Sequence, residues 1–131
     1  MADWNDVRRI ALALPQTSER SKRGLSWCVR GKFFAWERPL RPADLRALGK
    51  RAPQGPVLGL HVQQLDAKEA LLAARPDVVF TPPHFDGYAA ILVGLDAIDP
   101  TDLEELIVEA WLARAPKRLA QQYLEPSERR R

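Results

Sequence analysis

The sequence is poor in cysteine, methionine and histidine. Its 131 residues include one cysteine, one methionine and two histidines. The single cysteine, Cys28, excludes a disulfide within the chain and is typical of a protein in a reducing compartment. His61 and His84 fall in different predicted elements, whereas a zinc site needs three or four ligands held together. We therefore expect no metal and no other cofactor.

The sequence also lacks a long hydrophobic run. No apolar stretch approaches the roughly 20 residues that cross a bilayer, and two aspartates and two arginines among the first nine residues are unlike a signal peptide. We expect a cytoplasmic protein that does not bind membranes and is a monomer. Apolar residues make up 46% of the chain, an ordinary value for a globular protein. The length predicts one domain, residues 1–124, followed by a charged tail, residues 125–131, that should be frayed.

Signatures of common enzyme classes are missing as well. The chain has no Gly-x-Ser-x-Gly elbow for a nucleophilic serine and no glycine-rich loop for phosphates. Cys28 lies within an apolar strand pattern, which indicates a packed thiol rather than a nucleophile. We therefore expect a protein that is not an enzyme.

Positive charge is unevenly distributed along the chain. The net charge is +3, but residues 1–51 contain 12 Lys or Arg against 5 Asp or Glu, and residues 52–131 contain 8 against 12. A basic half of this kind indicates a surface that contacts phosphates. The alternative is that the arginines only solvate the surface.

Apolar spacing and capping residues predict three main helices. The first begins at Asp3, which has a second aspartate three residues later, and ends at Pro15. The second begins at a capping box formed by Asp66 and Glu69, and the third begins at Asp99, which precedes a proline. Two shorter helical segments are predicted at residues 43–48 and after Pro116.

Five strands are predicted from β-branched and aromatic runs. The first two form a hairpin through Arg30-Gly31, a turn that needs the glycine. The five strands are residues 25–30, 32–38, 57–62, 78–80 and 90–95. Together with the helices they predict an α+β fold with two layers, in which helices pack on a five-stranded antiparallel sheet. The expected order is α-β-β-β-α-β-β-α plus a C-terminal helix.

The segment Thr81-Pro82-Pro83-His84-Phe85-Asp86-Gly87-Tyr88 is a stiff loop rich in polar and aromatic groups. Two prolines fix two φ angles, and Asp-Gly favours a turn. His84, Asp86 and Tyr88 are therefore candidate residues of a small-ligand site, in which the imidazole acts as a base. The alternative is architectural, with Asp86 closing an Asx turn onto the amide of Tyr88.

Several segments together resemble the MmcQ/YjbR family of small bacterial proteins. They are residues 27–36, the loop 81–88, residues 92–99, and Ala110-Trp111 followed by Ala115-Pro116-Lys117-Arg118. The similarity spans residue 11 to about residue 124. It implies a compact two-layer α-β-β-β-α-β-β-α domain, and members of the family are commonly labelled DNA-binding proteins.

The basic half and this resemblance favour a module that contacts DNA phosphates. The candidate residues in the first half of the chain are Lys22, Arg23, Arg30, Lys32, Trp36 and Arg38. Alternation along residues 32–38 is expected to place Lys32, Phe34, Trp36 and Arg38 on one strand face, where cations and aromatics act together. In the alternative interpretation Phe34 and Trp36 belong to the core and the cations only flank the strand.

A second candidate anion site lies at the start of the last helix. If Pro116 is the first helical residue, Lys117 and Arg118 occupy the first turn beside unpaired backbone N–H groups. The alternative is that Pro116 only kinks a longer helix. A third class of function, a protein-interaction domain, would require exposed aromatics such as Trp4 or Trp36.

Overall fold

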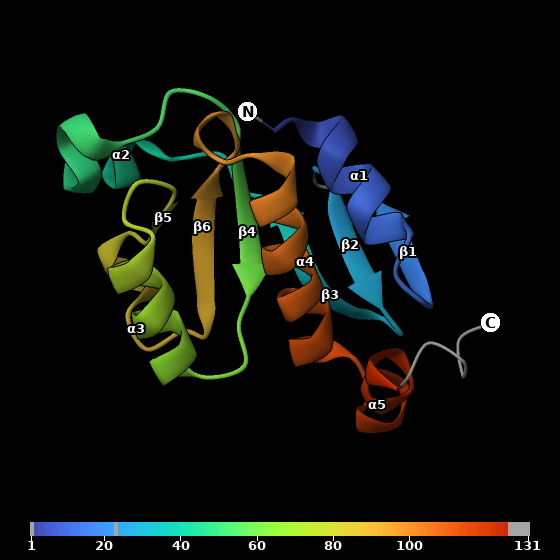
Figure 1. The fold of residues 1–131 in the computed structure, drawn as a ribbon. Helices are drawn as coiled ribbons and strands as arrows, with labels where there is room; N and C mark the ends of the chain where they lie inside the picture. Colours follow the sequence, from blue (N-terminus) through green and yellow to red (C-terminus); the bar gives the residue numbers. More distant parts are fainter. Residues whose placement is uncertain (1, 23, 126–131) are drawn as a thin grey trace.

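A computed structural model of the chain describes residues 2–22 and 24–125, without the side chains of Arg51 and His84. Over these residues the chain forms an α+β fold with an open, antiparallel six-stranded sheet and five α-helices (Figure 1). Arg23 and most of the predicted tail, residues 126–131, lie outside the described residues. None of the described helices is long and apolar enough to cross a membrane.

All neighbouring strands of the sheet are antiparallel, and their order is β1-β2-β3-β4-β6-β5. The α+β class and the antiparallel sheet are thus confirmed. The strands are β1 (Thr17–Arg20), β2 (Ser26–Val29), β3 (Lys32–Glu37), β4 (Val57–His61), β5 (Val79–Phe80) and β6 (Ala90–Gly94).

The predicted count of five strands is wrong because β1 has no hydrophobic pattern. Its sequence is Thr-Ser-Glu-Arg, and its residues alternate only between half-buried and exposed. Pairing with β2 makes it a strand, and Glu19 anchors it by accepting hydrogen bonds from the Trp27 indole at 2.9 Å and from Arg8 at 2.8 Å. Tertiary contacts therefore override the low β-propensity of this segment.

The caps of the first and fourth helices follow the predictions. Asp3 and Asp6 form a reciprocal capping box, and the Asp99 carboxylate accepts from the amide of Asp102. The predicted capping box at Asp66 is wrong, since the helix already begins one residue earlier and its cap, Gln64, makes no side-chain cap hydrogen bond. The helices are α1 (Trp4–Leu12), α2 (Pro42–Leu48), α3 (Leu65–Ala74), α4 (Pro100–Arg114) and α5 (Lys117–Leu124).

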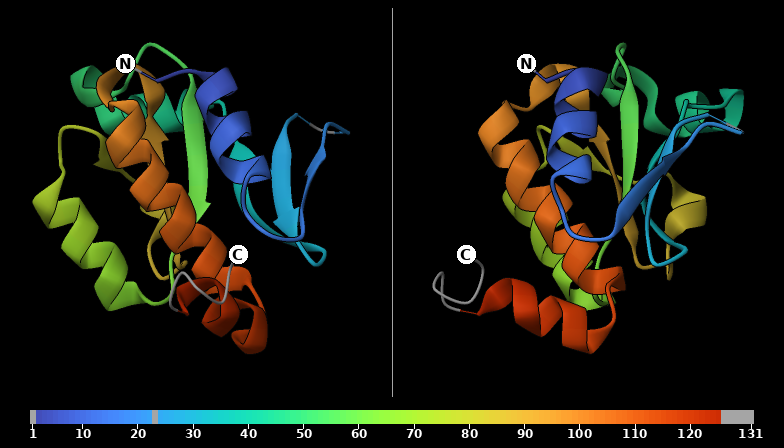
Figure 2. Two further views of the ribbon diagram at one scale, coloured as in Figure 1. Left: turned by 45° about the vertical axis from the view of Figure 1, so that its right-hand side comes forward. Right: turned by 90° about the vertical axis from the view of Figure 1, so that its right-hand side faces the viewer.

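The two faces of the sheet are covered differently (Figure 2, right). Helices α1, α3 and α4 pack on one face, where the main core includes Trp27, Phe34, Ile107 and Trp111. The other face carries α2 and the loop containing the short 3-10 turn η2 (Pro83–Phe85). Phe85 of this loop belongs to a smaller apolar cluster with Val57, Ala90 and Leu92. Part of this second face remains hollow, and it is here that the candidate site lies.

Candidate functional site

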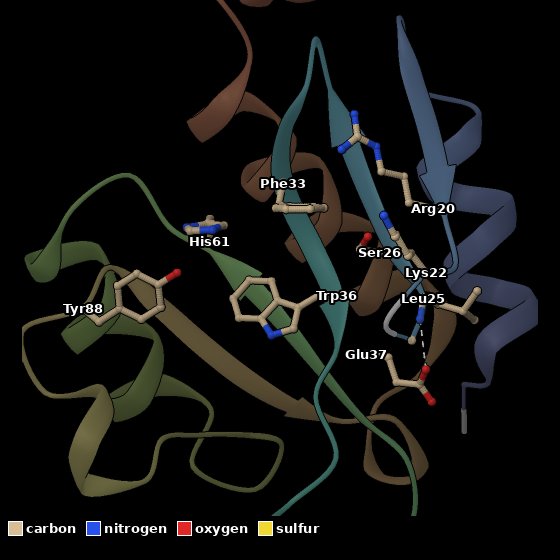
Figure 3. Close-up of a pocket in the computed structure, with 10 residues that line it drawn as sticks. Arg20, Lys22, Leu25, Ser26, Phe33, Trp36, Glu37, His61 and Tyr88 are labelled. Atoms are coloured by element: carbon tan, nitrogen blue, oxygen red, sulfur yellow. Dashed lines mark hydrogen bonds between the residues drawn. The ribbon is translucent and has the colours of Figure 1, made fainter.

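A groove of about 450 Å³ lies on the second face of the sheet, over β1 to β4 (Figure 3). We call it the sheet-face groove. Phe33, Trp36, His61 and Tyr88 supply its aromatic walls. Arg20, Lys22, Ser26 and Glu37 supply its polar groups.

Trp36 forms the floor of the groove because a glycine lies beneath it. Trp36 on β3 pairs with Gly59 on β4, and a Cβ at Gly59 would lie only 2.4 Å from the indole Cε2 atom. The indole therefore rests flat against the backbone of β4, a contact that only glycine allows. This packing leaves the opposite face of the ring toward the groove.

A β-bulge directs Phe33 and Trp36 to the same side of the sheet. Trp27 pairs with Ala35 and Cys28 pairs with Phe33, so Phe34 is an extra residue on β3. A bulge of this kind interrupts the alternation of side chains. Phe34 consequently packs in the core on the helix-covered face, fully buried, while Phe33 stays 43% exposed in the groove. The predicted single face for Lys32, Phe34, Trp36 and Arg38 is therefore wrong.

His61 connects the two sides of the groove. Its ring centroid lies 5.2 Å from that of Trp36 and 5.7 Å from that of Tyr88, whose hydroxyl points toward His61 and Trp36 in Figure 3. Burial lowers the pKa of His61 to about 4, the positive charge of Arg114 adds to this effect, and a hydrogen bond to the backbone of Ala89 opposes it. At neutral pH His61 is thus an uncharged ring.

Cations border the groove on the β1 side. Arg20 lies with its guanidinium carbon 5.8 Å from the centroid of the Phe33 ring, and Lys22 is exposed in the connection from β1 to β2. Within the described part of the chain, neither forms an ion pair with a carboxylate. The acidic group of the groove, Glu37, accepts a hydrogen bond from the Leu25 amide at 3.1 Å.

The loop of residues 81–88 is held in place by a buried lysine. The Lys68 side chain, 5% exposed, reaches from α3 and donates to the carbonyls of Phe85 and Tyr88, the second at 2.8 Å. Burial lowers the pKa of Lys68, and the negative charge of Asp86 opposes that shift. These bonds leave Tyr88 45% exposed at the groove.

Of the three candidate residues on this loop, one reaches the groove. Tyr88 lines it, whereas Asp86 is exposed outside it, and the His84 side chain lies outside the described parts. The predicted Asx turn is not what closes the loop, because the amide of Tyr88 donates to the carbonyl of Phe85 at 2.9 Å.

The prediction that Arg38 contacts nucleic acid is wrong, because Arg38 is a buried residue rather than a surface cation. It is 8% exposed, and its guanidinium lies 3.1 Å from the Asp44 carboxylate and 5.6 Å from the centroid of the Phe85 ring. It also donates to the carbonyl of Pro39 at 2.6 Å. Arg38 joins β3 to α2 and is not available to a phosphate.

Arg30 and Lys32 lie together at the hairpin end of β2. Arg30 and Gly31, both with positive φ (51° and 86°), form the hairpin turn, which is the predicted one, and Lys32 follows it. Lys22 lies beyond the opposite end of this four-residue strand. The hairpin end also receives the end of α4, because Arg114 donates to the carbonyl of Phe33 at 3.0 Å.

Lys117 and Arg118 are exposed in the first turn of α5, as predicted. Helix α4 ends at Arg114, and Pro116 is the residue before α5, so the alternative of one kinked helix is wrong. The chain turns there because Ala115, the residue before the proline, is extended and ends α4. Helix α5 then packs back, with the Tyr123 ring centroid 5.1 Å from that of Trp111.

Four residues of the site and its support escaped the sequence analysis: Arg20, Phe33, His61 and Lys68. Lys68 had a usable signal, because a lysine among the apolar residues of a helix face must find buried acceptors. Phe33 had none, since only the register of the hairpin reveals the bulge. Cys28 is fully buried, and this burial raises the pKa of its thiol, as the packed-thiol prediction requires.

A comparison with known proteins identifies the family. The model of the YjbR family matches residues 12–113. The uncharacterized proteins Mb2600 of Mycobacterium bovis and Rv2570 of Mycobacterium tuberculosis are each 50% identical to the chain over 127 residues, covering 95% of this chain and 97% of the relative. The crystal structure of Deinococcus radiodurans protein DR2400, with domain DUF419, is similar with a TM-score of 0.63. That match has 19% identity and covers 99% of this chain and 87% of the other, so it shows the fold alone. The chain belongs to the YjbR family.

Proposed function

We propose that this protein binds nucleic acid, DNA in particular, through the sheet-face groove and the cations next to it. The observation that carries the proposal is the meeting of exposed aromatic rings with Arg20 and Lys22 on one surface. Aromatic rings stack on bases and cations contact phosphates, and nucleic-acid sites combine the two.

The electrostatics of the surface support this proposal. Arg8, Arg9 and Arg38 are engaged with carboxylates, so they do not add to the attraction of a polyanion. Arg20 and Lys22 remain at the groove, and the hairpin end adds exposed Arg30 and Lys32. Contacts of this kind give salt-sensitive binding with little sequence preference.

The proposed role is binding rather than catalysis. A cysteine nucleophile reacts as the thiolate, and the buried Cys28 has a raised pKa. His61, with a pKa of about 4, is a weak base at neutral pH.

The test is fluorescence-anisotropy titration of labelled DNA with the double variant Arg20→Ala/Lys22→Ala at several salt concentrations. We expect weaker binding to all sequences, and a slope of log K against log salt that is shallower by about 0.7 for each lost contact with single-stranded DNA. Arg46→Ala/Lys50→Ala is the charge-matched control, because both residues are exposed and outside the groove. Equal losses in the two variants would contradict a site at the groove.

A second candidate is a small anionic ligand, and the size of the groove favours it. About 450 Å³ falls within the usual range of ligand pockets, about 300–1,000 Å³. A small ligand of the groove would raise the melting temperature of the protein. It would also compete with oligonucleotides for the same site. Thermal-shift screening with nucleotides and other aromatic anions tests this candidate.

A further inference from the structure

We infer that the sheet-face groove receives a single unpaired base, so that the protein selects single-stranded over duplex nucleic acid. The inference rests on the proposed function, because it names the part of the nucleic acid that enters the groove. It follows from the shape of the floor, the chemistry of the walls and the position of the cations.

The floor of the groove offers a fixed aromatic plane. Trp36 is held against Gly59, since any Cβ there would overlap the indole. A ring fixed in this way loses little conformational freedom when another ring stacks on it. The remaining face of Trp36 is a platform for one planar group.

The walls of the groove suit a planar aromatic ring. His61, uncharged at neutral pH, and Tyr88 flank the platform, and Phe33 lies on the Arg20 side. Every base has a π-face, so stacking here does not require a particular sequence. The hydroxyl of Tyr88 adds one hydrogen-bonding group at the edge.

The cations lie where the backbone of a stacked nucleotide would continue. Arg20 and Lys22 line the same groove as Trp36, on its β1 side. A base in a duplex is stacked between its neighbours and cannot lie on Trp36 without leaving the helix, which costs a few kcal/mol. A single strand avoids that cost, and this is the source of the expected selectivity.

The experiment compares four probes at one salt concentration: a dT 12-mer, an abasic 12-mer with the same phosphates, a 12-base-pair duplex and thymidine monophosphate. We expect the dT 12-mer to bind about tenfold more tightly than the abasic strand, and more tightly than the duplex. Stacking should also quench tryptophan fluorescence with the dT 12-mer and not with the abasic strand.

Two variants test the platform and the wall separately. Trp36→Leu should abolish the quenching and the preference over the abasic strand while leaving abasic binding unchanged. Tyr88→Ala, which truncates a side chain that is 45% exposed, should reduce the same preference. Trp4→Phe is the control and should keep the quenching. Trp4 does not line the groove, and its ring stacks on that of Trp27, with the two centroids 6.2 Å apart.

The outcomes separate the inference from the proposed function. Equal binding of the dT and abasic strands, or duplex binding as tight as that of the dT strand, would overturn the base pocket while leaving nucleic-acid binding in place. Monophosphate binding as tight as that of the dT strand would assign the groove to a free nucleotide and overturn the strand-binding inference. Failure of every probe to bind would overturn the proposed function together with the inference.

Discussion

At the scale of single residues, buried charge decides the shape of the candidate site. Lys68 on α3 is a cation with 5% exposure, and its two acceptors are backbone carbonyls of the loop that carries Tyr88. A buried ammonium is costly unless such acceptors surround it. The loop is therefore stiffened by its prolines, as the sequence predicts, and positioned by a lysine 20 residues away from Tyr88.

Replacing Lys68 with methionine should destabilise the protein and loosen this loop. The methionine keeps most of the volume but removes the ammonium that donates to the carbonyls of Phe85 and Tyr88, which then keep only their backbone donors. We expect the free energy of unfolding to fall by about 1–3 kcal/mol. Urea unfolding and hydrogen exchange of the loop amides measure the two effects. Lys50→Met, at an exposed position, is the matched control. A loss no larger than in the control would show that Lys68 does not hold the loop.

At the scale of elements, the hairpin of β2 and β3 shows how far a sequence pattern can be trusted. The turn at Arg30-Gly31 is predicted correctly, and both residues have the positive φ of a two-residue type I′ loop. The prediction of which side chains share a face of β3 is wrong, because the bulge at Phe34 shifts the alternation of side chains by one residue. Turn chemistry is local and readable, whereas a bulge depends on what the neighbouring strand and the core require.

Gly59→Ala tests the contact that fixes Trp36. The added Cβ would lie 2.4 Å from the indole, so the ring must move, and we expect a loss of about 1–3 kcal/mol in the free energy of unfolding. Near-ultraviolet circular dichroism should change as the indole shifts, and the preference for the dT strand should fall. Gly94→Ala on β6 is the control, where a Cβ would meet Pro53 at 3.3 Å. If both variants unfold alike and keep their tryptophan spectrum, the indole is not held by Gly59.

At the scale of the whole molecule, one face of the sheet provides stability and the other provides the groove. Helices α1, α3 and α4 bury the main core on the first face, and the groove uses residues of β1 to β4 on the second. The basic half of the sequence, residues 1–51, forms α1, β1 to β3 and α2. Because β1, β2 and β3 are neighbours in the sheet, the excess of basic residues lies on one side of the molecule.

The pH dependence of stability should report the burial of His61 in this second face. Its pKa of about 4 in the folded protein lies below the ordinary value of 6.5, so between these values the unfolded chain binds a proton that the folded protein does not. The free energy of unfolding should therefore fall as the pH falls from 7 to 5, by about 1–2 kcal/mol from this residue. Urea unfolding of His61→Gln at pH 7, 6 and 5 should give a flatter profile than the wild type. Parallel profiles would contradict the burial of His61 as the cause.

The sequence by itself determined the helices with polar caps, the glycine turn, five of the six strands and the family. Each of these depends on interactions within a few residues or on a motif that spans them, so one stretch of sequence carries the information. Only the tertiary structure decided the polar edge strand β1, the bulge at Phe34, the burial of Arg38 and the meeting of Arg20, Trp36, His61 and Tyr88. These features arise from pairing and packing between segments distant in the chain, where the energy of a residue depends on its partners rather than on its neighbours in sequence.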